Sequence, residues 1–357
     1  MLRPLAIAVV ALAMILTASR MRAAVDAPPP WAYGFAGLAS EPAAKPAPAP
    51  PTQDDGSPKS LPGSERKFTL TEIRDGFGPA DWYPGDHPEM PDVVARGRKP
   101  DIRACALCHY PNGKGRPENA GVSGLPNAYF VQTMADFKNG ARRSADSRKA
   151  NTNIMIAIAK AMTDDEVAAA ARYFGSMKWT PWVKVVEAAT VPKTRIAAGL
   201  FLKQPGSETE PIGNRIIEVP TDVDANQILR SSRGTWVAYV PMGAIARGKN
   251  LVTTGGSSIV NGKIVLGRAT ACVTCHGQDL RGMGQDIPPL AGRSPSYLAR
   301  EIFDIQQGTR VGSYPLMPLM KKAVEKLTAE DMIDITAYLA SLPVDGPAPG
   351  NLTLTRR

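Results

Sequence analysis

Apolar and polar residues alternate with helical periodicity in two separate parts of the chain. In residues 162–176 and 327–341 the apolar side chains recur at intervals of three and four positions, which predicts one amphipathic helix in each segment. Near the start of both segments a Thr is followed three positions later by an acidic residue. This is the pattern of a capping box, in which the two side chains close the first turn of a helix. The sequence therefore predicts where each helix begins.

The region between these helices has a different pattern. Residues 179–242 contain the β-branched and aromatic runs "WVKVV", "RIIEV" and "TWVAYV", separated by Pro and Gly, and such runs favour short strands. Further along, "SSIVNGKIVLG" places Asn261 and Gly262 between two apolar runs, which predicts a β-hairpin. We therefore expect residues 179–242 to form a small strand-bearing connector between helical parts.

The N-terminus carries an apolar run of its own. Residues 5–18 are almost entirely apolar and follow Arg3, as in a secretory signal peptide. This run is shorter than the roughly 20 residues needed to cross a hydrocarbon core of about 30 Å, so we expect residues 1–24 to direct export to the periplasm. Arg20 and Arg22 lie where a cleavage site prefers small residues. An uncleaved anchor that associates the protein with the membrane therefore stays open as an alternative.

A Pro- and Ala-rich segment follows at residues 25–63. Such a composition buries too little apolar surface to order itself, so we expect a disordered tether here and a flexible tail at residues 343–357. Trp31, Tyr33 and Phe35 form a small aromatic group at the start of the tether. This group either packs on the folded body or docks on a partner or membrane.

The chain contains an internal repeat. "ACALCH" at 104–109 matches "ACVTCH" at 271–276, and a Tyr and a Gly 11 residues apart recur in both copies. The two capped helices follow in the same order, 165 residues apart. Matching blocks in one order at a nearly constant offset indicate a tandem duplication.

Each copy carries a Cys-x-x-Cys-His motif, the signature of c-type haem attachment. Two thiols on one helical turn can form thioether bonds to both vinyl groups of one porphyrin, and the adjacent His then faces the iron. The alternatives are a redox dithiol, which needs no His, and a zinc site built from both Cys pairs, whose ligands would have to converge from distant parts of the chain. We therefore expect two covalently attached haem c groups, held by the residues Cys105, Cys108, His109, Cys272, Cys275 and His276.

With these motifs the sequence resembles the tandem dihaem class I c-type cytochromes, over about residues 90–178 and 243–342. The resemblance implies a mainly α fold with two tandem cytochrome c domains, the first at residues 64–178 and the second at 243–342. It also implies axial ligation of each iron by His and Met. By the family pattern, Met155 would bind opposite the first motif and Met320 opposite the second, with Met317 as the alternative to Met320.

The same resemblance suggests further contacts with the cofactors. Arg142 and Arg310 would pair with haem propionates, or else be solvated arginines, and Tyr129 and Tyr297 would lie beside the haems. His87 is the one histidine outside the motifs, and we expect it to cap a turn, with iron ligation as the alternative.

The family pattern also predicts how the helices and the histidines are held. Gly97 and Gly248 would let the first helix of each domain cross close to the closing helix. In the second copy the loop that begins at Pro288 would orient His276 through a backbone carbonyl. The first copy reads "NAGVSG" at this place, which leaves the partner of His109 open.

Composition and charge narrow the function further. The chain is 43% hydrophobic, which suits a packed core, and four Cys are too few for a disulfide scaffold. Lys and Arg exceed Asp and Glu by nine, but no basic stripe interleaved with aromatic residues occurs, so we expect no nucleic-acid binding. The expected partners are redox proteins, namely a dehydrogenase donor and a cytochrome or oxidase acceptor.

A haem iron with His and Met on its two faces has no open position for a substrate. We therefore expect a periplasmic electron carrier, or the electron-transfer subunit of a dehydrogenase or respiratory chain, rather than an enzyme. The alternative is a dihaem peroxidase-like enzyme in which one haem stays open.

Overall fold

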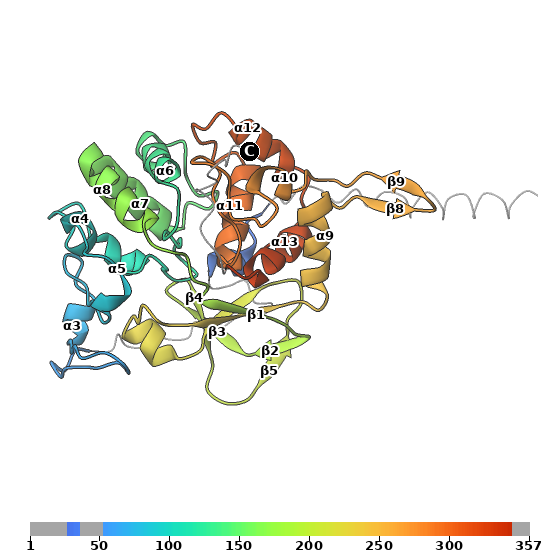
Figure 1. Cartoon of the computed structure of the whole chain (residues 1–357). Coiled ribbons are helices and arrows are strands. Elements are labelled where there is room, and N and C mark those ends of the chain that lie inside the picture. The colour runs from blue at the N-terminus through green and yellow to red at the C-terminus, as the bar shows by residue number, and fades with distance from the viewer. Residues whose placement is uncertain (1–26, 36–52, 345–357) are drawn as a thin grey trace, which may run out of the picture.

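The computed structural model describes residues 27–35 and 53–344. The two helical units lie side by side, with helices α4 to α8 in the first and helices α9 to α13 in the second, and strands β1 to β7 form a β unit on one side of both (Figure 1). The expectations for residues 1–24, for the central part of the tether and for the C-terminal tail beyond residue 344 lie outside the described residues. Within the described residues no helix is both long and apolar enough to cross a membrane.

The first helical unit consists of five helices. These are α4 (Asp92–Ala95), α5 (Cys105–His109), α6 (Asn127–Asn139), α7 (Ala150–Ala161) and α8 (Asp164–Gly175). Helix α8 begins at the predicted capping box, where Thr163 accepts a hydrogen bond from the Glu166 backbone and Glu166 accepts one from the Thr163 backbone. Aromatic residues of α6 and α8, among them Phe130 and Phe174, pack in the core of this unit.

The second helical unit repeats this order. Its helices are α9 (Ala244–Thr254), α10 (Val273–His276), α11 (Pro295–Gln306), α12 (Met317–Val324) and α13 (Ala329–Ser341). The capping box of Thr328 and Asp331 starts α13, as predicted. Helices α9 and α13 cross at Gly248, where an added Cβ would lie 1.8 Å from the Asp334 carbonyl oxygen. The expected close crossing is therefore present in this unit.

The expected counterpart of that crossing is absent from the first unit. Helix α4 ends at Ala95, and Gly97 follows it in a loop with a φ of +65°. An added Cβ on Gly97 would meet the Ile102 carbonyl oxygen at 2.0 Å rather than a residue of α8. Gly97 is thus required by its left-handed backbone and by a tight turn, and the prediction that it lets two helices cross is wrong.

The connector forms a larger β unit than the sequence indicated. All three predicted strands exist, as β1 (Val183–Glu187), β6 (Ile217–Pro220) and β7 (Trp236–Val240), and they form one sheet with β7 in the centre, parallel to β1 and antiparallel to β6. Two further antiparallel pairs join β2 (Thr190–Pro192) to β5 (Thr209–Pro211) and β3 (Thr194–Ala197) to β4 (Leu200–Lys203). A short helical turn spans Asp224–Ile228.

The β unit and the second helical unit share one hydrophobic core. Trp182 and Trp236 of the connector belong to the same cluster as Phe303 of α11 and Met332 of α13. The fold is therefore helical in its two repeats and β-rich between them, so "mainly α" describes the repeats better than the whole chain.

Two parts of the predicted tether are folded. Helix α2 (Pro30–Tyr33) buries Trp31 and Tyr33 against α11, and the Tyr33 hydroxyl donates a hydrogen bond to Asp304 at 2.9 Å. Leu61 is buried with Trp82 in a small core that also holds α3 (Leu70–Ile73). The prediction of disorder is wrong for residues 27–35 and 53–63, because a few buried aromatic and aliphatic side chains fix these otherwise Pro- and Gly-containing segments.

The predicted hairpin is present as β8 (Ser258–Val260) and β9 (Lys263–Val265). Asn261 and Gly262 connect the strands with φ values of 50° and 75°, the left-handed geometry that a two-residue hairpin turn requires. The hairpin projects away from the rest of the molecule (Figure 1).

Candidate haem-binding sites

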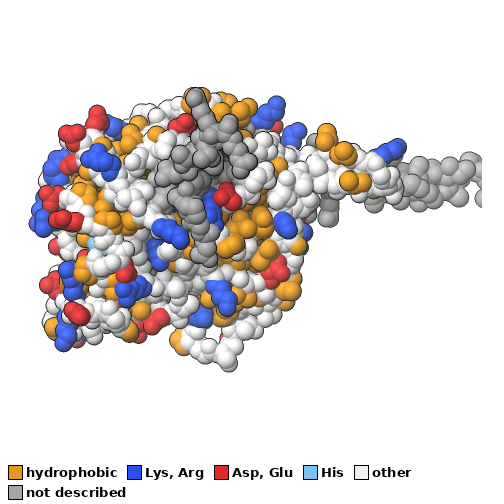
Figure 2. All heavy atoms as spheres, in the orientation of Figure 1, with side chains coloured by type: hydrophobic (Ala, Val, Ile, Leu, Met, Phe, Trp, Pro, Cys, Tyr) orange, Lys and Arg blue, Asp and Glu red, His pale blue; other side chains and the backbone are white. Residues whose placement is uncertain are grey.

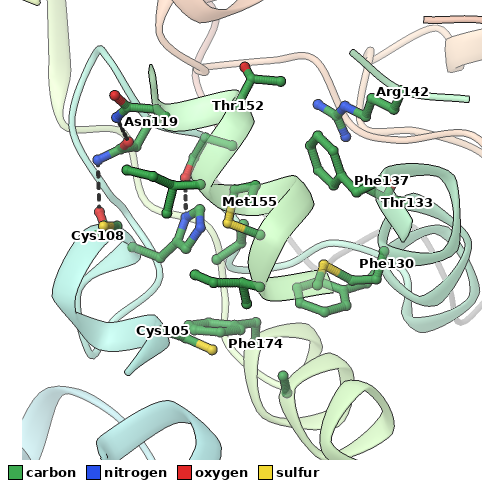
Figure 3. Close-up of a pocket in the computed structure, with 18 of the residues that line it drawn as sticks. Cys105, Cys108, Asn119, Phe130, Thr133, Phe137, Arg142, Thr152, Met155 and Phe174 are labelled. Carbon is green, nitrogen blue, oxygen red and sulfur yellow. Dashed lines mark hydrogen bonds between the residues drawn. The ribbon is translucent and has the colours of Figure 1, made fainter. Parts of the chain in front are cut away.

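Helix α5 directs the first Cys-x-x-Cys-His motif into a large cavity. Cys105, Cys108 and His109 line one side of it, and Met155 lines it from α7. The cavity has about 1340 Å³ of space without protein atoms, part of which opens to solvent. Figure 3 shows Cys105, Cys108 and Met155 around this space, with the aromatic rings of Phe130 and Phe174 from α6 and α8 beside it.

His109 is held by a single backbone contact. Its Nδ1 lies 2.8 Å from the carbonyl oxygen of Ala120, so Nδ1 carries the proton and Nε2 is the nitrogen left to bind a metal. Burial lowers the pKa of His109, with the Ala120 contact opposing this in part. The loop "NAGVSG" therefore supplies the carbonyl that its sequence left uncertain.

The thiols have the wrong electrostatics for a redox dithiol. Burial raises the pKa of Cys105 to about 12 and also raises the pKa of Cys108, whereas a reactive cysteine needs a lowered pKa. In the described part of the chain no group of three or more His, Cys, Asp and Glu side chains could hold a metal ion, so the two Cys pairs do not converge on a zinc site. The cavity fits a porphyrin instead, with thiols, an imidazole, a thioether sulfur and apolar walls around one space.

Charged side chains occupy the part of the cavity that borders the second unit. Arg142, Lys149, Arg300 and Glu301 all line it. Burial lowers the pKa of Lys149 to about 7, and the neighbouring Arg300 adds to the effect. Buried cations in this position suit the propionate groups of a haem.

The two repeated arginines meet at the boundary between the helical units. Arg142 and Arg310 pair as an isolated antiparallel bridge, and both form ion pairs with Glu301, at 2.8 Å for Arg142. Arg310 also donates a hydrogen bond to the Tyr129 hydroxyl at 2.6 Å. Burial opposes the charge of Arg142, but Glu301 outweighs this and raises its pKa. Neither arginine is the solvated side chain that the sequence left open.

The two repeated tyrosines belong to the same cluster. Tyr129 and Tyr297 both line the first cavity, and burial raises the pKa of Tyr297 to about 12. The structure thus brings four sequence-predicted residues together, whereas the counter-ion Glu301 gave no signal in the sequence.

The second motif follows the same plan. His276 is buried at the end of α10, and its Nδ1 lies 2.9 Å from the Pro288 carbonyl oxygen, as the resemblance implied. Burial raises the pKa of Cys272 to about 11. Met317 and Met320 of α12 are both partly buried against the core of this unit, so both stay candidates for the sixth ligand.

His87 is engaged elsewhere. Its Nδ1 lies 2.8 Å from the Pro88 carbonyl oxygen and its Nε2 lies 3.2 Å from Asp81. Both ring nitrogens are therefore committed to a turn, which agrees with the capping role expected for it.

Both repeats match a known protein family. The family model "Cytochrome c" matches residues 94–178 and again residues 259–343. A 39% identical relative, cytochrome c-554(548) of Halomonas halodenitrificans, is matched over 82% of its length and 20% of this chain. The chain belongs to the cytochrome c family. It contains two tandem cytochrome c domains, and such domains bind covalent haem c, one in each.

Longer matches extend beyond a single domain of this cytochrome. The thiosulfate dehydrogenase electron acceptor of Thiomonas intermedia is 24% identical over 249 residues, which is 69% of this chain and 81% of that protein. The solved thiosulfate dehydrogenase from Marichromatium purpuratum is 24% identical, with a TM-score of 0.44. The match covers 74% of this chain and 43% of that one.

Proposed function

We propose that this cytochrome is a periplasmic electron-transfer protein that works through two His/Met-ligated haems, either as a free carrier or as the electron-transfer subunit of a dehydrogenase or respiratory chain. The haem groups supply reversible one-electron chemistry when bound. The protein chain fixes their ligands, excludes water and provides surfaces for redox partners.

The observation that carries this proposal is the arrangement of ligand atoms in the first cavity. His109 is fixed by Ala120 so that Nε2 is available, and Met155 presents its sulfur to the same space from another helix. An iron closed on both faces changes its ligands little between oxidation states, which favours electron transfer over substrate chemistry. In the second domain we propose His276 with Met320 as ligands and Met317 as the alternative.

The proposed partners are redox proteins. The Thiomonas relative is named as the electron acceptor of a thiosulfate dehydrogenase, which supports a dehydrogenase as the donor for this cytochrome. The apolar run at residues 5–18 supports export, and haem c attachment is consistent with a periplasmic location.

The visible spectrum of the oxidised, haem-loaded protein tests this function. We expect two low-spin haems and the weak long-wavelength band of Met-to-iron charge transfer. A high-spin haem that binds added cyanide or peroxide would instead favour the peroxidase-like alternative.

A further inference from the structure

The hairpin of β8 and β9 exposes a contiguous group of aliphatic side chains. Ile259, Ile264 and Leu266 are each about three-quarters exposed or more, and Val260 and Val265 are about half exposed. Single exposed apolar residues are common on proteins, but a contiguous group of this size marks an interaction site. Figure 2 shows hydrophobic side chains along this projection, which stands clear of the body.

These side chains lie on both faces of the hairpin. The register pairs Ile259 with Ile264 on one face, and Val260 with Lys263 on the other, where Val265 also lies. A flat protein surface would cover only one face, whereas the headgroup region of a bilayer surrounds an inserted hairpin on both. An isolated two-stranded hairpin is also marginally stable in water, so a surrounding apolar medium would stabilise it.

The charge of this part of the chain is one-sided. Residues 249–278, which include the hairpin, contain Lys249, Lys263 and Arg268 and no Asp or Glu. Lys263 directly follows the turn, and Figure 2 shows basic side chains near the tip and base of the projection. An aliphatic tip with basic residues around it suits an anionic lipid surface, where headgroups attract the cations while the apolar residues enter the interface.

We propose that the hairpin of residues 256–267 is a membrane-docking element that inserts its aliphatic tip into the headgroup region of an anionic phospholipid bilayer. The chain runs directly from the hairpin to Cys272 and the second haem motif. Docking through the hairpin therefore holds the second cytochrome domain at the lipid surface, independently of residues 1–24 and of the redox role proposed above.

The test is vesicle binding by the haem-loaded protein. Sedimentation with vesicles of equimolar phosphatidylcholine and phosphatidylglycerol is compared with vesicles of phosphatidylcholine alone. Hydrogen exchange of residues 256–267 is measured with and without vesicles, so that binding by any other segment is distinguished. We expect protection of the hairpin on the anionic vesicles, and much weaker binding to the neutral ones.

The double variant Ile259→Ser/Ile264→Ser should reduce binding at least tenfold and abolish hairpin protection. Because both side chains are exposed, the fold and both haem spectra should be unchanged. Val131→Ser is the matched control, since Val131 is a 42% exposed aliphatic residue of α6 in the other domain, and it should bind as the unsubstituted protein does. Lys263→Glu should weaken binding to the anionic vesicles and leave binding to the neutral vesicles unchanged.

Two results would overturn the proposal. One is a hairpin that exchanges equally fast with and without anionic vesicles. The other is that the unsubstituted protein sediments as a dimer and the Ile259→Ser/Ile264→Ser variant as a monomer. The hairpin would then bind a second copy of the chain rather than a membrane.

Discussion

One buried arginine connects the loops that orient both haem-facing histidines. Arg293 is 3% exposed and donates hydrogen bonds to the carbonyl oxygens of Gly121 at 2.6 Å, Ser123 at 3.2 Å and Pro289 at 3.0 Å. Its guanidinium also lies 4.3 Å from the ring centroid of Trp179.

Two of the three acceptors of Arg293 are direct neighbours of the histidine partners. Ala120, which holds His109, precedes Gly121, and Pro288, which holds His276, precedes Pro289. Replacing the arginine should therefore disturb both histidines at once, although they belong to different domains.

The magnitude follows from the three carbonyl groups. Arg293→Met keeps much of the apolar length but removes the donor from two buried carbonyls, of Gly121 and Ser123, and from the partly buried carbonyl of Pro289. Each buried group left unsatisfied costs about 1–3 kcal/mol. Burial lowers the pKa of Arg293 to about 10, so part of the loss is recovered when the charge is removed. We expect a net loss of about 3 kcal/mol in the free energy of unfolding.

Urea unfolding and a redox titration of the same variant measure both effects. Arg96→Met is the control, because the Arg96 side chain is 73% exposed and its loss should change little. For Arg293→Met we expect a lower urea midpoint and shifted midpoint potentials of both haems. Stability equal to that of the control, or a potential shift confined to one haem, would show that Arg293 does not connect the two histidine loops.

Three further predictions concern packing, ligation and pH. Gly248→Ala should destabilise the second domain by about 2 kcal/mol or more, because the added Cβ would lie 1.8 Å from a backbone oxygen; Gly85→Ala, with nothing within 4 Å, should unfold at the unchanged urea midpoint. Met320→Ala should lower the potential of the second haem and open it to cyanide, whereas the same result from Met317→Ala alone would reassign the ligand. Burial raises the pKa of Glu218 from 4.5 to about 7, so between these pH values the folded state holds a proton that the unfolded state has released. The free energy of unfolding should therefore fall as the pH rises from about 4.5 to about 7. Glu218→Gln should remove this part of the pH dependence in thermal unfolding, and an unchanged slope would contradict it.

Local signals in the sequence predicted local structure well. The capping boxes at Thr163 and Thr328 start their helices, and the Asn261–Gly262 pair forms the hairpin turn. Each of these features depends on residues a few positions apart, so the sequence contains the whole interaction. The haem motifs are local in the same way.

Contacts between distant segments were not predictable. Glu301 forms ion pairs with both repeated arginines, and Arg293 bonds to Gly121, which lies 172 positions away. A Glu or an Arg in the sequence does not indicate which distant residue it will contact. The prediction of a disordered tether was wrong for a related reason, because Tyr33 is held by a hydrogen bond to Asp304, which lies 271 residues away. The prediction of a helix crossing at Gly97 was wrong because a Gly suits a tight turn and a helix crossing equally well.

The two-haem assignment is tested most directly by a spectroscopic redox titration of the haem-loaded protein, combined with an iron count. We expect two irons per chain, both low-spin in the oxidised state, each titrating as a one-electron centre. One iron per chain, or a high-spin haem with exchangeable water, would contradict it.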